Sequence, residues 1–221
     1  SQDEVVSWDK SRKFLRWRWK EDDSVSVYTG HKRDVLGVRK LSSERLVSWS
    51  KDKTLRIWNL TKPDSSIILS GHEANLGGAK PIKENRILSW EQRASNKRLR
   101  IWDAETGKCL DIKPGPTDFI LDVNDNGKIL CAKDTLLRIE DPLTGTEHLR
   151  LEGHKDDICF GAFIKDERLL SGDWEGVMNL WDIKKGTLLM SFEGHAGSVG
   201  GGTVLADGRL ISWDDNTIRL W

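Results

Sequence analysis

Histidine and aspartate are the residues in this chain whose recurrence could carry chemistry. Four histidines each follow a glycine, and they stand at His31, His72, His154 and His195. The first two are 41 positions apart, the last two are also 41 apart, and the middle gap is twice as long. A histidine beside an aspartate is the pair that hydrolases use as a general base and its orienting group. The pattern therefore raises the question of a repeated catalytic dyad.

A structural role explains this recurrence better than catalysis does. A hydrolase needs one constellation, and triad geometry is not repeated at a fixed period along a chain. Metal binding is also disfavoured, because the histidines fall one to a repeat and the cysteines (Cys109, Cys131 and Cys159) have no CxxC spacing. We therefore expect no catalytic residue, no metal and no cofactor, and the chain is not predicted to be an enzyme.

Charge and cysteine content narrow the possible partners. Lys+Arg and Asp+Glu both number 35, so the net charge is zero, whereas a dedicated nucleic-acid binder normally carries a basic excess. An odd number of cysteines fits a reducing setting, and we expect a cytoplasmic location. No apolar run reaches membrane-spanning length. We expect neither a nucleic-acid nor a membrane partner.

The elements that must position the histidines are short strands in repeats of about forty residues. A tryptophan follows each Gly-His pair, at Trp58, Trp102, Trp181 and Trp221. Alternating and apolar runs between turn residues predict four strands per copy. In the first full copy they are expected at Val35–Lys40, Arg45–Ser50, Thr54–Leu60 and Ser66–Leu69, with a break at Lys62-Pro63-Asp64. One such antiparallel sheet would form one blade.

We divide the chain into a single domain, residues 1–221, made of successive blades. Their approximate bounds are 1–30 (partial), 31–71, 72–113, 114–153, 154–194 and 195–221 (partial). The copy at 114–153 is degenerate, because Glu140-Asp141 replaces Trp-Asp and no Gly-His precedes it. Both partial copies contain a second and a third strand, so they cannot complete one shared blade. We therefore expect an excerpt of a larger ring, with other domains of a longer parent chain as further partners.

The recurring phrase resembles the WD-repeat family of β-propellers, whose signature is Gly-His followed by Trp-Asp. It is present as Gly71-His72 with Trp102-Asp103 and as Gly153-His154 with Trp181-Asp182. The resemblance implies an all-β propeller of four-stranded antiparallel blades, with five to six blades represented. Ser-Trp pairs, as at Ser48-Trp49, are similar to repeats of bacterial members of the family.

The resemblance also implies a hydrogen-bonded set of His, Ser, turn Asp and Trp inside each blade. Carried over to this sequence, the two complete sets are His31, Ser48, Asp52, Trp58 and His195, Ser212, Asp215, Trp221. In the copies with His72 and His154, the turn position holds Asn96 and Glu175, so a complete set is not implied there. The degenerate copy keeps Asp134 but lacks the His and the Trp, and we expect no set in it.

The function that the resemblance implies is a non-enzymatic scaffold that presents one propeller face to a protein partner. Residues beside the turn Asp or at the start of inner strands should lie on that face: Trp174, Asp157, Asp34, Lys51, Asn75, Asp118, Lys133, Ser198 and Asp214. Trp174 is the strongest candidate, because tryptophan at a solvent-facing turn can dominate a binding energy. The alternative is that Trp174 replaces the packing of Trp49 in other copies, since this copy has Gly172 at that position.

Two other functions remain as alternatives. The first is a ligand-sensing module of a bacterial signalling ATPase of the STAND type, or of another effector-linked protein. The second is nucleic-acid binding, suggested by basic residues interleaved with Trp17 and Trp19 between Arg12 and Lys20. Strand alternation favours a simpler interpretation of that stretch, with one apolar and one solvated side.

Overall fold

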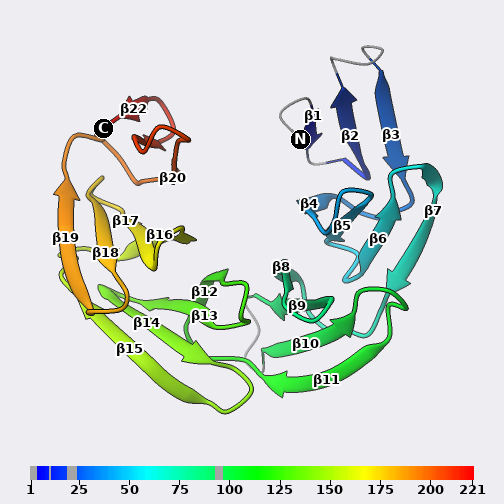
Figure 1. Cartoon of the computed structure of the whole chain (residues 1–221), viewed down its shortest axis with the longest axis horizontal. Coiled ribbons are helices and arrows are strands. Elements are labelled where there is room, and N and C mark those ends of the chain that lie inside the picture. The colour runs from blue at the N-terminus through cyan, green and yellow to red at the C-terminus, as the bar shows by residue number, and fades with distance from the viewer. Residues whose placement is uncertain (1–3, 10, 19–23, 93–96) are drawn as a thin grey trace. The chain divides into compact units, whose positions relative to one another are not determined.

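A computed structural model describes residues 4–9, 11–18, 24–92 and 97–221 of the chain. It divides into two compact units, Ser1–Gly115 and Pro116–Trp221, and each is described by itself. The regular structure in the described residues consists of antiparallel strands (Figure 1). Within that part of the chain, no helix is long and apolar enough to cross a bilayer.

The first unit contains three sheets, A to C, which follow one another in chain order (Figure 1). Sheet A comprises β1 (Glu4–Trp8), β2 (Lys13–Arg18) and β3 (Val25–Thr29). Sheet B comprises β4 (Val35–Lys40), β5 (Arg45–Ser50), β6 (Leu55–Asn59) and β7 (Lys62–Leu69). Sheet C comprises β8 (Leu76–Ile82), β9 (Arg86–Glu91), β10 (Arg98–Asp103) and β11 (Cys109–Pro114).

The second unit repeats this plan with sheets D to F. Sheet D comprises β12 (Phe119–Val123), β13 (Ile129–Lys133), β14 (Leu136–Asp141) and β15 (Thr146–Glu152). Sheet E comprises β16 (Ile158–Ile164), β17 (Arg168–Asp173), β18 (Met178–Asp182) and β19 (Thr187–Phe192). Sheet F comprises β20 (Gly201–Val204), β21 (Leu210–Trp213) and β22 (Ile218–Leu220).

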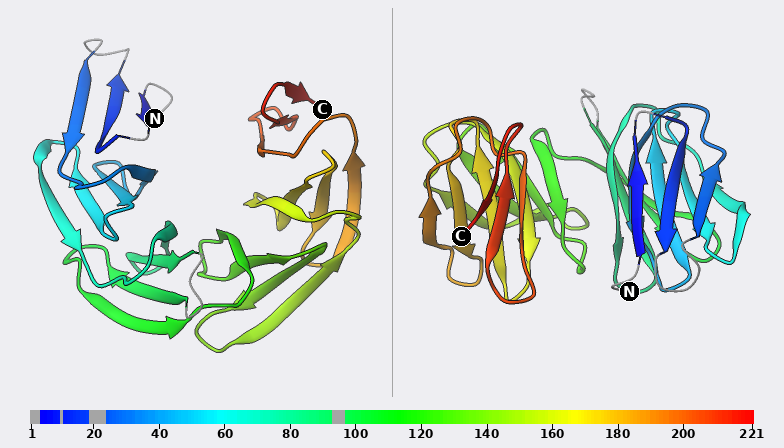
Figure 2. Two further views of the ribbon diagram at one scale, coloured as in Figure 1. Left: turned by 180° about the vertical axis from the view of Figure 1, so that it is seen from behind. Right: turned by 90° about the horizontal axis from the view of Figure 1, so that it is seen from above.

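Within each unit the sheets stack face to face, and their first strands lie side by side (Figure 2). β4 contacts β8 in unit 1, and β12 contacts β16 in unit 2. Between sheets B and C, buried side chains from both interdigitate, including Leu55 and Ile57 with Ile87 and Trp102. One sheet cannot bury both of its own faces, and such stacking is how propeller blades bury theirs. The predicted all-β class of antiparallel blades is confirmed.

The predicted break before the fourth strand of sheet B is wrong. The hairpin closes earlier, because Asn59 pairs directly with Lys62, and β7 begins at Lys62. Pro63 therefore lies inside a strand. This is tolerated because β7 is an outermost strand of its sheet, where a missing N–H does not interrupt a ladder.

On the inner strands of some sheets, a tryptophan of the second strand packs against a glycine of the first strand. The Trp49 ring lies against Gly37, where a Cβ would come 2.1 Å from the ring, and Trp213 lies against Gly201 in the same way. Sheet E has no such tryptophan. The space at Gly172 is filled by Val199 of the following segment, whose Cβ would lie 2.4 Å from an added Cβ. Trp174 is therefore not the substitute for Trp49.

Candidate functional site

A set of four hydrogen-bonded side chains lies inside sheet B. His31 Nε2 is 2.8 Å from Ser48 Oγ, and His31 Nδ1 is 3.0 Å from Asp52 Oδ2. The indole of Trp58 donates to the same Ser48 oxygen at 2.7 Å. The turn between β5 and β6, which carries Asp52, is thereby tied to the loop that precedes β4.

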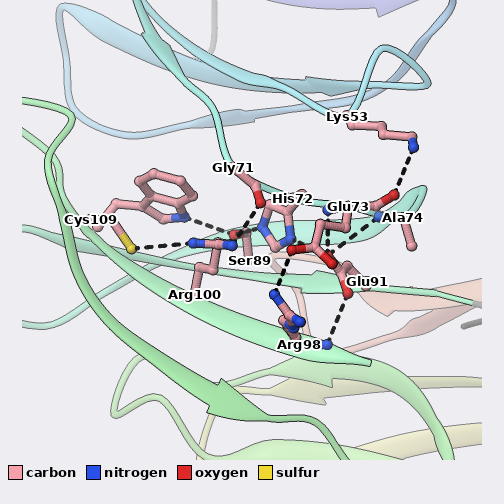
Figure 3. A network of polar contacts seen from close by, with 11 residues as sticks. Lys53, Gly71, His72, Glu73, Ala74, Ser89, Glu91, Arg98, Arg100 and Cys109 are labelled. Atoms are coloured by element: carbon pink, nitrogen blue, oxygen red, sulfur yellow. Dashed lines mark hydrogen bonds and ion pairs between the residues drawn. The ribbon is translucent and has the colours of Figure 1, made fainter. Parts of the chain in front are cut away.

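Sheet C contains the same set, with a glutamate in place of the aspartate (Figure 3). His72 Nδ1 is 3.1 Å from Glu91 Oε1, and Ser89 Oγ lies 2.7 Å from His72 Nε2 and 2.8 Å from Trp102 Nε1. Glu91 also accepts the Arg98 N–H at 3.0 Å. Asn96, which the sequence placed at this turn, lies outside the described residues.

Sheets E and F correct two of the predicted positions. In sheet E the acid is Asp173, 2.8 Å from His154 Nδ1, whereas Glu175 is exposed. In sheet F the acid is Asp214, 3.1 Å from His195 Nδ1, and not Asp215. Asp214 was expected on the partner-binding face, but its carboxylate instead belongs to this buried set.

The spacing between the serine and the acid explains why the acids of sheets E and F were predicted at the wrong positions. In sheets C, E and F the acid follows the buried serine by two residues, as Asp173 follows Ser171. Sheet B is the exception, because Ser50 holds that position and its hydroxyl accepts the Asp52 N–H at 3.0 Å. The family pattern places the acid correctly in sheet B. In sheets C, E and F, an acid two residues after the serine would have been the correct indicator.

The direction of each hydrogen bond follows from the groups involved. An ionised carboxylate only accepts, so the histidine carries its proton on Nδ1 and leaves Nε2 as an acceptor. The serine hydroxyl then donates to Nε2 and accepts the indole N–H. Burial lowers the pKa of His31, His72 and His154 and outweighs the opposing effect of the acids, which favours this neutral form.

The acid of sheet B is held in its ionised form. Burial raises the pKa of Asp52, but hydrogen bonds from Thr54, the Lys32 N–H and His31 outweigh it and set this pKa at about 2. An ionised carboxylate hydrogen-bonded to a neutral imidazole gives each of these buried polar groups a hydrogen-bond partner, as a stable buried network requires.

The order of groups is that of a hydrolytic Ser-His-Asp triad, yet its setting differs. The four serines are fully buried, at Ser48, Ser89, Ser171 and Ser212. Each hydroxyl also accepts an indole N–H, so it faces a tryptophan rather than a substrate. The arrangement fixes turns within a blade.

The environment of Cys159 disfavours thiol chemistry. The three cysteines are free thiols, and burial together with Asp173 raises the pKa of Cys159 to about 11. Such a thiol is protonated at neutral pH and is a poor nucleophile. Within the described residues, no group of three His, Cys, Asp or Glu side chains is placed to hold a metal ion.

Sheet D replaces the set with a different polar cluster. Cys131 stands at the serine position and Glu140 at the tryptophan position, and Cys131 Sγ lies 3.9 Å from Glu140 Oε1. Asp118 was predicted on the binding face, but it is buried and paired with Arg138. The Arg138 guanidinium compensates the charge of this buried carboxylate. Burial raises the pKa of Glu140 despite the nearby Arg138.

The other predicted face residues lie at the turns or at the starts of inner strands. Lys51, Asn75, Lys133 and Asp157 are exposed, whereas Asp34 and Ser198 are half-buried. Backbone bonds align three of the turns, since the N–H groups of Lys51, Gln92 and Trp174 donate to the carbonyls of Asp34, Asn75 and Asp157. Lys51 also forms an ion pair with Asp34 at 2.8 Å. Trp174 is 61% exposed.

A pocket of about 460 Å³ lies elsewhere in unit 2. Its lining comes from turns and strand ends, including Asn124, His148, Phe163 and Lys184. It contains none of the residues that the sequence predicted for binding.

Comparison with known proteins identifies the repeats. A family model described as "WD domain, G-beta repeat" matches residues 22–59 and 145–182. The chain carries WD40 repeats. Each matched stretch ends just after the network tryptophan, Trp58 in one and Trp181 in the other, so it includes a complete His-Ser-acid-Trp set.

A similar curated protein is "Protein tipD" of Dictyostelium discoideum, 26% identical over 95 residues. That similarity covers 41% of this chain and 16% of that protein, so the chain matches only a small part of its length. The predicted resemblance to the WD-repeat family is confirmed, and WD40 propellers commonly mediate protein interactions.

Proposed function

We propose that this WD40-repeat chain is a non-enzymatic protein-interaction module, and that unit 2 binds a partner at the tip of the β17–β18 turn. Trp174 supplies the central contact and Asp157 a neighbouring charge. The observation that carries the proposal is the exposure of Trp174, at 61%, in a chain whose network tryptophans Trp58, Trp102 and Trp181 are buried.

Packing does not account for Trp174. In sheet E, Gly172 aligns with Trp49 of sheet B, and the space beside it is occupied by Val199, whereas Trp174 lies in the turn that follows and is mostly exposed to solvent. An indole that stays exposed to water does not gain the free energy that burial of its apolar surface in the core would give. Tryptophan is enriched among the residues that dominate binding energies, because it offers a large rigid surface.

The comparison with sheet B suggests the chemistry of the partner. There, Lys51 occupies the aligned position and neutralises Asp34 at 2.8 Å. In sheet E the lysine is replaced by Trp174, and among the described residues no side chain forms an ion pair or hydrogen bond with Asp157. An aromatic face beside an uncompensated carboxylate suits a lysine or arginine of the partner, through a cation–π contact and an ion pair.

The turn is also held in one conformation before any partner arrives. The Trp174 N–H donates to the Asp157 carbonyl at 3.1 Å, and Asp173 is fixed by His154. Gly176 has φ +86° and lies so close to the following loop that a Cβ would be 2.5 Å from the His195 carbonyl. Preorganisation of this kind lowers the entropy lost on binding.

A random-peptide display selection against the chain tests the proposal. We expect basic residues to be enriched, and the selected peptides should lose about 30-fold in affinity for Trp174→Ala, which corresponds to about 2 kcal/mol. Asp157→Asn should weaken binding less and reduce its salt dependence. Leu143→Ala, at a comparably exposed apolar residue on another turn, is the matched control. Peptides that bind Trp174→Ala as tightly as the parent chain would contradict the proposal.

A further inference from the structure

Sheet F has an apolar face that has no cover in this structure. Strand pairing identifies its residues, because Ile218 stands opposite Trp213 as Leu55 stands opposite Trp49 in sheet B. By the same register, Leu220 corresponds to Ile57. Cross-strand partners lie on the same side of a sheet, so these residues form one continuous face.

The equivalent face of sheet B shows what such a face normally contacts. Trp49, Leu55 and Ile57 are buried in a single cluster with Ile87 and Trp102 of sheet C. In sheet F, Trp213 is 41% exposed, Leu220 52% and Ile218 73%. The two central rows of this face carry no charged side chain, although 32% of the chain is charged. The face therefore has the composition of a blade interface.

Sheet A presents the complementary half of that interface. Trp17 donates its indole N–H to Ser7 Oγ at 3.0 Å, as Trp102 donates to Ser89 in sheet C. Trp102 is buried against sheet B, whereas Trp17 is 44% exposed. Val5 and Val25 flank Trp17 in the same row, and both are exposed.

The contact between sheets A and B shows how such a tryptophan seats. The Trp58 ring of sheet B meets the Phe14 and Tyr28 rings of sheet A edge-on, at centroid distances of 5.4 and 5.8 Å. Phe14 corresponds in register to Ile218, since each stands opposite the last tryptophan of its neighbouring strand, Trp8 and Trp213. The exposed Ile218 thus occupies a position that receives a tryptophan from the next sheet.

We propose that sheet F of one molecule docks on sheet A of a second copy of this chain, with Trp17 of the second copy seated against Ile218 and Leu220. The chain itself supplies both halves of an interface that it already forms between sheets A and B and between sheets B and C. The contact is heterologous, because it joins two different surfaces, and after a first docking event the dimer keeps one free face of each kind. Association therefore continues to larger species as concentration rises.

Sedimentation equilibrium of the 221-residue chain tests this directly. The concentration should range from about 1 to 200 μM, because an interface of modest size is weak and is occupied only at the higher concentrations. We expect the average mass to increase with concentration. Ile218→Asp blocks the sheet F face and Val5→Asp blocks the sheet A face. Each variant alone should be monomeric, yet a one-to-one mixture should form a dimer and stop there, because each partner retains one complementary face.

Met190→Asp provides the matched control, because Met190 is an equally exposed apolar residue on the outer strand β19, and this variant should associate like the parent chain. Circular dichroism checks that each variant is folded, and Ile218→Ser and Val5→Ser replace any that is not. A parent chain that stays monomeric throughout the range overturns the proposal. So does a single-face variant that still associates, because the contact would then not join sheet F to sheet A.

Discussion

Each network depends on its buried serine, because the serine hydroxyl donates to the histidine Nε2 and accepts a hydrogen bond from the tryptophan indole N–H. Replacing Ser89 with alanine would leave both Trp102 Nε1 and His72 Nε2 without their partner in a dry environment. Each buried unsatisfied group costs about 1–3 kcal/mol, so the loss of both partners should lower the free energy of unfolding of Ser89→Ala by about 2–6 kcal/mol. Urea titration measures this loss.

Ser70→Ala is the control for that substitution, since Ser70 is exposed and makes no side-chain hydrogen bond within the described residues. It should change the free energy of unfolding by less than about 0.5 kcal/mol. If Ser89→Ala were equally mild, the network would not stabilise the blade.

Protonation of the network histidines gives the chain a defined pH dependence. Burial lowers the pKa of His31, His72 and His154 below the ordinary value of 6.5. Below pH 6.5 the unfolded chain therefore binds more protons than the folded chain, and stability decreases as the pH falls. Glu140, whose pKa is raised above 4.5, acts in the opposite sense, but it is a single group.

We accordingly expect a lower urea midpoint at pH 5.5 than at pH 7.5, and little change from these groups between pH 7.5 and 8.5. The stabilisation from Asp52, with its pKa of about 2 against an ordinary 3.8, should persist until much more acidic conditions. A midpoint that is constant or higher at pH 5.5 would show that the histidines are not held neutral.

The histidines and tryptophans of the networks could be read from the sequence because their spacing repeats. The acids could not be assigned in the same way, because hydrogen bonding depends on where a carboxylate lies in space and not on its order in the turn. Asp173 reaches His154 from the end of β17, and Asp214 reaches His195 from just beyond β21, whereas Asp52 reaches His31 from within a turn. The burial of Asp118 needed a partner, Arg138, that lies twenty residues away.

At the scale of the strand, packing between glycine and a large neighbour controls how closely sheets approach. Gly172→Ala would bring a Cβ to 2.4 Å from Val199 Cβ, in a buried site where neither group can move freely. Overpacking of this kind typically costs about 1–3 kcal/mol, and we expect a loss of that size in the free energy of unfolding. Thermal or urea unfolding gives the value.

Gly197→Ala is the matched control, because a Cβ at Gly197 would meet nothing within 4 Å. Gly172→Ala combined with Val199→Ala should recover part of the loss if the steric contact is its cause, since the two sites are then coupled. Simple addition of the two effects would exclude that cause.

Strand existence was largely predictable, and strand limits were less so. Apolar alternation located Val35–Lys40 and Arg45–Ser50 at the bounds that the structure shows, because both strands are buried within a repeated sheet. The outer strand β7 began earlier than expected, since proline is a poor breaker at an edge. The exchange of tryptophan for Val199 at Gly172 could not be foreseen, because it joins two different sheets.

At the scale of the whole molecule, local stability should follow how many faces of a sheet are covered by its immediate neighbours within the same unit. Sheet B is packed on both faces within unit 1, and sheet E is packed on both faces within unit 2. Sheets A and F each have an exposed apolar face. We expect hydrogen exchange, followed by mass spectrometry at low concentration, to be slowest in β5, β6, β17 and β18 and fastest in β1 and β22.

Hydrogen exchange repeated at high protein concentration tests whether self-association protects the strands that exchange fastest at low concentration. If sheet F docks on sheet A of a second copy, protection should rise selectively in β1, β2, β21 and β22 and should stay constant in β5 and β17. Ile218→Asp should remove that rise without altering the low-concentration pattern, because only the docking face has changed. Uniform protection along the chain at low concentration would show instead that the two exposed faces do not limit local stability, since opening would then be global.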